Sequence, residues 1–123
     1  MIPGNIKIKN LRTFLPSKDY DLSRRFYQKM GFTETWHSPE MSVYQLGDFS
    51  FYLQKFYVED WANNFMMFVE TDNCDEWWAY MESLNLKEKF PTIKLIPPKS
   101  EAWGRECMLI DPTGVLWHFG EFV

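Results

Sequence analysis

Residues 102–121 read AWGRECMLIDPTGVLWHFGE, and they predict a β-hairpin near the end of the chain. An apolar run leads into Asp-Pro-Thr-Gly at positions 111–114, and a second apolar run follows it. The proline presets φ for a turn, and the glycine tolerates the positive φ at which such turns often close. Alternation along the second strand places His118 on the face opposite Trp117 and Phe119. What surrounds the His118 face therefore decides the function.

The length and composition predict one domain, residues 1–123, that is rich in aromatic side chains. Of its 123 residues, 46% are hydrophobic and 24% are charged, as in ordinary globular proteins. The 11 Phe, 6 Tyr and 6 Trp residues make up 19% of the chain. Aromatic residues suit strands, and they also line pockets for flat organic ligands. We expect a β-rich core in which a handful of rings serve a ligand.

Charge and targeting signals narrow the classes of function. The net charge of −4 argues against a nucleic-acid partner, because such proteins present basic patches. Acidity mildly favours a cationic ligand, and it is also a common means of staying soluble. Cys74 and Cys107 lack the spacing of a metal site or a disulfide framework, and the sequence shows neither a signal peptide nor a membrane span. These features predict a reduced, cytoplasmic protein with no membrane partner.

The first half of the chain predicts one strand, one helix and three further strands. Asp19 is placed to cap the start of the helix, and Gly31 is placed to end it. Gly47 and Asp48 predict a tight turn between the last two strands. The expected strands are residues 6–15, 32–36, 42–46 and 49–55.

The second half predicts the same order of elements after a linker, residues 56–64. Asn73, with Glu76 three residues later, resembles a capping box and opens a helix. The apolar side chains of this helix recur at helical spacing, at Trp77, Met81 and Leu84. The expected strands are residues 65–70, a weaker strand at 86–95 that Pro91 interrupts, and the two strands of the hairpin, with a loop at 96–100.

The two halves overlay as a repeat. Residues 14–19 align with residues 67–72, and a helix with aromatic side chains follows each segment. Because identity between the halves is low, the repeat depends on the order of elements and the aligned helix starts. We expect an α+β fold of two βαβββ modules, about residues 5–56 and 64–123. Their strands would form a curved mixed sheet, or trough, with the helices packed outside.

Several short motifs carry a resemblance to a known superfamily. FLPSKDYD at 14–21, RFY at 25–27 and MGF at 30–32 form a strand-helix passage, and WGRE at 103–106 with DPTG at 111–114 forms the closing hairpin. Over nearly its whole length, the chain resembles the vicinal oxygen chelate superfamily of paired βαβββ modules. This superfamily includes glyoxalase I, ring-cleaving dioxygenases and bleomycin-resistance proteins. The closing hairpin resembles the bleomycin-binding branch in particular.

The resemblance also implies four positions at which the superfamily's enzymes hold a divalent metal. In this chain those positions fall on Arg12, Tyr52 (with Gln54 two residues on), Phe65 and His118. Only His118 is a good ligand, because a guanidinium repels a cation and a benzyl ring cannot coordinate one. A catalytic metal normally needs three protein ligands. We therefore predict no metal or other cofactor and no catalytic residue, with His118 the one weak candidate for a metal.

One parity of strand positions is expected to face the trough and to hold an organic ligand. Rings, a thioether and a few hydrogen-bonding groups are the lining of a small-molecule pocket. Trp117 and Phe119 are assigned to the core, and His118 is left open between a structural role and ligand contact. The predicted ligand-binding residues are Arg12, Phe14, Tyr52, Gln54, Phe65, Met67, Trp103, Glu106 and His118.

The leading hypothesis is a metal-free, homodimeric protein of the bleomycin-resistance type that sequesters an aromatic drug or metabolite. The resemblance implies a ligand cleft between subunits and a bleomycin-type antibiotic as a candidate ligand. Arg12, however, suits an anionic or carbonyl-bearing ligand better than a cation, unless Glu106 or another carboxylate neutralises it. The alternatives are a metal-dependent glyoxalase-like lyase/isomerase or dioxygenase, and a fold used only for protein–protein contact. The sequence names no ligand, and it leaves open whether the modules pair within one chain or exchange between chains.

Overall fold

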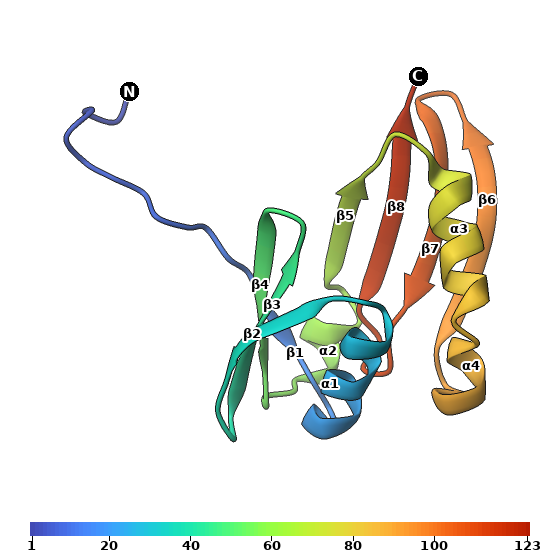
Figure 1. The fold of residues 1–123 in the computed structure, drawn as a ribbon, viewed down its shortest axis with the longest axis horizontal. Coiled ribbons are helices and arrows are strands. Elements are labelled where there is room, and N and C mark those ends of the chain that lie inside the picture. Colours follow the sequence, from blue (N-terminus) through green and yellow to red (C-terminus); the bar gives the residue numbers. More distant parts are fainter.

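The computed structural model describes residues 1–123 and contains two four-stranded sheets that lie side by side (Figure 1). The first module runs through β1 (Phe14–Pro16), α1 (Tyr20–Lys29), β2 (Thr33–His37), β3 (Met41–Leu46) and β4 (Phe49–Gln54). A short helix, α2 (Glu59–Ala62), follows. The second module comprises β5 (Met66–Glu70), α3 (Cys74–Ser83), α4 (Leu86–Lys89), β6 (Lys94–Glu101), β7 (Gly104–Ile110) and β8 (Leu116–Phe122).

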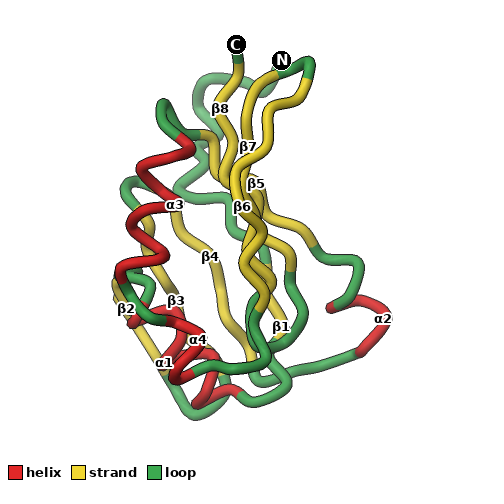
Figure 2. The backbone as a smooth tube through the Cα atoms, turned by 90° about the vertical axis from the view of Figure 1, so that its right-hand side faces the viewer, coloured by secondary structure: helices red, strands yellow, loops and turns green.

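The two sheets have the same topology. Their strand orders are β1-β4-β3-β2 and β5-β8-β7-β6. In each sheet the first strand pairs in parallel with the last, and the other pairs are antiparallel. In Figure 2, α3 lies along one side of the second sheet, while α2 lies on the opposite side of the molecule. The structure confirms the predicted α+β fold of two βαβββ units.

The capping residues predicted from the sequence begin and end the helices. Asp19 accepts a hydrogen bond from Leu22 N at 3.1 Å, and Asn73 accepts one from Glu76 N at 3.1 Å. Each bond satisfies a backbone donor that has no partner inside its helix. Gly31 follows α1 with φ +91°, a left-handed conformation that favours glycine. No helix in the structure has the length and apolar character needed to cross a membrane.

The two modules share one hydrophobic core, and Tyr27 lies at its centre. The ring of Tyr27 on α1 lies 5.8 Å from that of Trp117 on β8 and 5.3 Å from that of Phe51 on β4. Trp117 and Phe119 are fully buried, as predicted. Because α1 packs against strands of both sheets, the burial of one module depends on the other.

A buried carboxylate fixes the hairpin turn against α1. Asp111 Oδ1 accepts hydrogen bonds at 2.9 Å from three successive backbone N–H groups of the turn, at residues 113–115. Its other oxygen accepts one from the Tyr27 hydroxyl at 2.5 Å, and that hydroxyl accepts another from Trp117 Nε1 at 3.0 Å. Burial raises the pKa of Asp111, and the hydrogen bonds that it accepts oppose this shift. Sequence signals for a local turn therefore also specify how the modules dock.

A second polar cluster ties α1 to the first sheet. Glu34 on β2 accepts two hydrogen bonds from Arg24, at 2.9 and 2.8 Å, one from Tyr44 at 2.8 Å and one from Ser42 at 3.0 Å. The Arg24 guanidinium is the main reason that the pKa of Glu34 falls to about 2. The carboxylate is well shielded, with 11% of its side chain exposed.

Four predictions about individual elements are wrong. The strand expected at 6–15 is reduced to β1, because residues 1–11 extend away from the body as an exposed arm (Figure 1). The linker contains α2, and the segment expected as a weak strand at 86–95 begins with α4. Residues 96–100, expected as a loop, belong to β6. The proline pair 97–98 lies there at a register shift on an edge strand, where missing N–H donors are tolerated.

Replacing Tyr27 with Phe is expected to lower the free energy of unfolding by about 1–3 kcal/mol, because Asp111 Oδ2 and Trp117 Nε1 would lose their buried partner. Urea denaturation measures the effect. Tyr57→Phe is the matched control, since the Tyr57 ring contacts Lys18 and its hydroxyl has no hydrogen-bond partner in the protein. Equal losses in the two variants would contradict the role given to the Tyr27 hydroxyl.

Glu34 is expected to make the free energy of unfolding depend on pH in the acidic range. Its pKa is lower in the folded protein than in the unfolded chain, so its contribution is complete above about pH 4.5 and is lost as the pH falls towards 2. Glu34→Gln should be less stable than wild type at pH 7, and the difference should shrink across this window. Urea midpoints at a series of pH values test this expectation, and a difference that stays constant with pH would refute it.

Candidate functional site

The open face of the second sheet carries a cluster of exposed rings. Phe68 on β5 lies 6.1 Å from Trp103, 5.8 Å from Phe122 and 5.9 Å from His118, measured between ring centroids. Trp103 and Phe122 are 5.4 Å apart. Phe68, Trp103 and Phe122 are 46%, 37% and 57% exposed. We call Phe68, Trp103, His118 and Phe122 the second-sheet platform.

Strand register and one glycine make this platform possible. Phe68 is the direct partner of His118 in the parallel β5–β8 pair, so the two rings share a face. Gly120 lies beneath the rings, where an added Cβ would come 2.5 Å from Phe68 Cζ and 3.3 Å from Trp103 Cη2. A side chain at this position would therefore displace the rings.

His118 has a defined partner within the platform. Its Nδ1 lies 3.2 Å from Oε2 of Glu106 on β7, and the two side chains are 20% and 15% exposed. The structure thus brings three of the predicted residues together. Trp103 and His118 lie beside the unpredicted Phe68, and Glu106 joins them through its contact with His118. Glu106 and His118 therefore add a hydrogen-bonding pair beside the cluster of rings around Phe68.

The first sheet carries a second group of rings with a cation beside them. Phe14 on β1 stacks on Tyr52 on β4, with ring centroids 4.7 Å apart and planes 27° apart. Arg12 Nε donates to Ser50 Oγ at 2.7 Å, and its Nη1 donates to Tyr52 Oη at 3.3 Å. The structure therefore brings Arg12, Phe14 and Tyr52 together. Gln54, two residues beyond Tyr52 at the end of β4, is half-buried and pairs with Pro16.

Trp36 extends the first-sheet surface across the neighbouring strands. The register runs Phe14–Tyr52–Val43–Trp36 across β1, β4, β3 and β2, and Trp36 is about half-exposed. We call Phe14, Trp36 and Tyr52 the first-sheet platform.

The predicted inward face of β5 is wrong by one residue. Phe65 and Met67 were expected beside His118, but Met67 pairs with the buried Trp117, and both side chains pack against the core. They also line an open cavity of about 1030 Å³ beside β5, which Leu11 of the arm and Phe49–Phe51 of β4 line as well. The residues of β5 that share the face of His118 are Met66 and Phe68.

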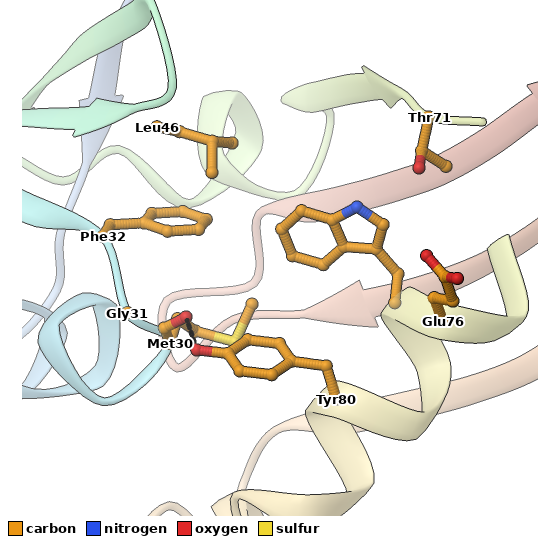
Figure 3. Close-up of a pocket in the computed structure, with 8 residues that line it drawn as sticks. Met30, Gly31, Phe32, Leu46, Thr71, Glu76 and Tyr80 are labelled. Carbon is orange, nitrogen blue, oxygen red and sulfur yellow. Dashed lines mark hydrogen bonds between the residues drawn. The ribbon is translucent and has the colours of Figure 1, made fainter. Parts of the chain in front are cut away.

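A smaller cavity, of about 340 Å³, lies at the joint between the modules (Figure 3). The Tyr80 hydroxyl on α3 donates to the Met30 carbonyl at the end of α1, at 2.8 Å. Phe32, Leu46, Thr71 and Glu76 also line the cavity. None of the predicted ligand-binding residues reaches it.

The platforms do not suit a resident divalent metal. No group of three or more His, Cys, Asp or Glu side chains in the structure could hold an ion. His118 and Glu106 face each other, but two such ligands are fewer than the three that a catalytic metal normally needs. On the first sheet, Arg12 would repel a cation.

Comparisons with known proteins agree with this architecture, although no protein-family model matches the chain. A bleomycin resistance protein from Klebsiella pneumoniae is 26% identical over 110 residues, which are 83% of each chain. A crystal structure of a bleomycin-binding protein complexed with bleomycin has a TM-score of 0.77 and 21% identity, covering 94% of this chain and 100% of that one. A glyoxalase-related enzyme from Fulvimarina pelagi has a TM-score of 0.70 and 19% identity, covering 93% and 88%.

Two open sheets with this strand order, shared with binding proteins and glyoxalase-related enzymes alike, define the vicinal oxygen chelate fold. The bleomycin resistance determinant encoded on the transposon Tn5 has a TM-score of 0.75 and 24% identity, covering 93% of this chain and 98% of that one.

Sequence reasoning missed Trp36, Phe68 and Phe122 as surface rings. Phe122 follows the alternation of His118 along β8, and this signal was available in the sequence. Phe68 and Trp36 depend on the register of β5 with β8 and of β2 with β3. Register between distant segments is not a local property of the sequence.

Replacing Gly120 with Ala is expected to displace the rings of the second-sheet platform, because the new methyl group would overlap Phe68. The Trp103 indole N–H signal in a two-dimensional NMR spectrum should shift, while the protein stays folded. Gly4→Ala is the control, since nothing lies within 4 Å of a Cβ there. An unchanged Trp103 signal in Gly120→Ala would show that the rings do not depend on this glycine.

Proposed function

We propose that this protein binds an aromatic antibiotic or metabolite and sequesters it unaltered, in the cytoplasm and without a metal. The bleomycin-resistance and bleomycin-binding homologues support an antibiotic-binding function. The ligand would contact Arg12 and the two platforms. The chain would act as one domain made of two modules, about residues 5–56 and 64–123.

The exposed aromatic platforms are the observation that carries this proposal. Five rings, those of Phe14, Trp36, Phe68, Trp103 and Phe122, leave between a third and a half or more of their surface open to water. Clustered apolar exposure of this kind marks a binding surface. Stacking a planar ring on such side chains contributes about 0.5–1.5 kcal/mol per pair beyond the burial of area. The Glu106–His118 pair supplies polar contacts that would orient the ligand.

We further propose that the cleft forms between two copies of the chain, as a homodimer. Residues 1–11 are exposed throughout, and Ile6 and Ile8 alternate with lysines as in a strand with one apolar face. The cavity of about 1030 Å³ beside β5 begins at Leu11, where the arm leaves the body. β5 is an edge strand with unpaired backbone groups. The arm of a second copy would fill the cavity beside β5 and pair with the backbone groups at the β5 edge.

The proposed dimer predicts that deletion of residues 1–10 weakens self-association. Sedimentation velocity should show wild type as a dimer and the deletion variant shifted towards the monomer. The double variant Lys7→Ser/Lys9→Ser retains the apolar face and is the control that should remain dimeric. A monomeric wild type would refute the proposed dimer.

Trp103→Ala should weaken ligand binding by about 1–3 kcal/mol, because the indole would be lost as a stacking surface. Titration calorimetry with bleomycin-type glycopeptides and then with a panel of aromatic metabolites measures the loss. Trp61→Ala removes an indole that is more exposed than Trp103 and lies outside both platforms, and it should leave affinity unchanged. An affinity that Trp103→Ala does not change would remove Trp103 from the site.

Metal content separates this proposal from a glyoxalase-like lyase/isomerase or a dioxygenase. Protein purified without chelator is expected to contain little Ni, Zn, Fe or Mn by plasma mass spectrometry. A near-stoichiometric ion, with turnover that is lost on chelation, would establish the enzyme instead.

A further inference from the structure

Arg12 is a half-buried cation that no carboxylate neutralises. Its Nε donates to Ser50 Oγ and its Nη1 to Tyr52 Oη, and both acceptors are uncharged. Two other arginines, in contrast, form ion pairs with carboxylates: Arg24 with Glu34 and Arg105 with Asp75. The carboxylate that could have compensated Arg12, that of Glu106, pairs with His118 on the other sheet.

The two hydrogen bonds hold the guanidinium in one orientation and leave part of it open. A guanidinium has five N–H donors, so Nη2 and one N–H of Nη1 have no protein partner. The carbon at its centre lies 5.3 Å from the centroid of the Tyr52 ring, and Phe14 stacks on the same ring. A fixed positive charge with an open donor edge therefore borders an aromatic surface.

We infer that the ligand of this protein is a flat aromatic molecule that carries an anionic group, such as a carboxylate or a sulfonate. The ring system packs against the exposed Phe14 ring, which Tyr52 supports from its other side, and the anion accepts hydrogen bonds from the open edge of the Arg12 guanidinium. Guanidinium and carboxylate match in geometry, and hydrogen bonds between charged groups are about twice as strong as neutral ones. This inference rests on the proposed function and specifies its ligand. It also makes a purely cationic drug the poorer match.

A matched series of acridines tests the charge preference on one flat scaffold. Acridine-9-carboxylate is an anion and 9-aminoacridine is a cation at neutral pH, and their binding is followed by fluorescence titration. Wild type should bind the carboxylate about tenfold more tightly than the amine. Arg12→Gln should lose most of this preference by weakening the carboxylate alone, and Arg12→Lys should retain part of it.

Arg25→Gln is the control, because it removes the same charge from an exposed position on α1 and should leave the preference intact. Circular dichroism and thermal unfolding verify that the Arg12 variants fold. If both acridines bind and Arg12→Gln leaves their ratio unchanged, or if wild type prefers the cation, the inference is overturned and the binding function stands. If neither these probes nor the calorimetric panel binds, the proposed function fails and the inference fails with it.

Discussion

The carboxylate of Asp111 joins the two halves of this molecule. One of its oxygens organises the turn between β7 and β8, and the other reaches the Tyr27 hydroxyl on α1 of the first module. Thr113 in the same turn accepts a hydrogen bond from the backbone N–H of Lys18, two residues before α1. The turn thus fixes β8 relative to α1, and β8 presents Trp117 to the core and His118 to the open face. The geometry of the open face depends on this one docking contact.

The arrangement divides the aromatic residues into two populations. One group, centred on Tyr27, lies between α1 and the strands and is closed to water. The other forms the platforms, whose rings are stacked on or tilted against one another on an open surface. The high aromatic content of the chain therefore has two explanations, stability for the first group and ligand contact for the second. Composition alone cannot separate them, because both uses draw on the same residue types.

The sequence predicts most of the architecture because most of its signals are local. Asp19 and Asn73 cap helices through atoms three residues away, and the hairpin turn carries its own Asp, Pro and Gly. The face of β5 could not be predicted in the same way. Whether Met67 or Phe68 lies beside His118 depends on pairing with a strand 50 residues distant, and a shift of one residue exchanges the faces. The prediction therefore placed the correct residue, His118, on the open face of β8 but chose the wrong face of β5.

The proline pair in β6 has a consequence for the behaviour of the protein at high concentration. Residues 97 and 98 supply no backbone N–H groups at the outer margin of the second sheet, and the ladder is already irregular there. A strand of another molecule could not accept hydrogen bonds from these two positions. Fibril formation by strand pairing at this edge is therefore disfavoured. Within the second sheet, pairing with a strand of another molecule is therefore left to the opposite edge, at β5.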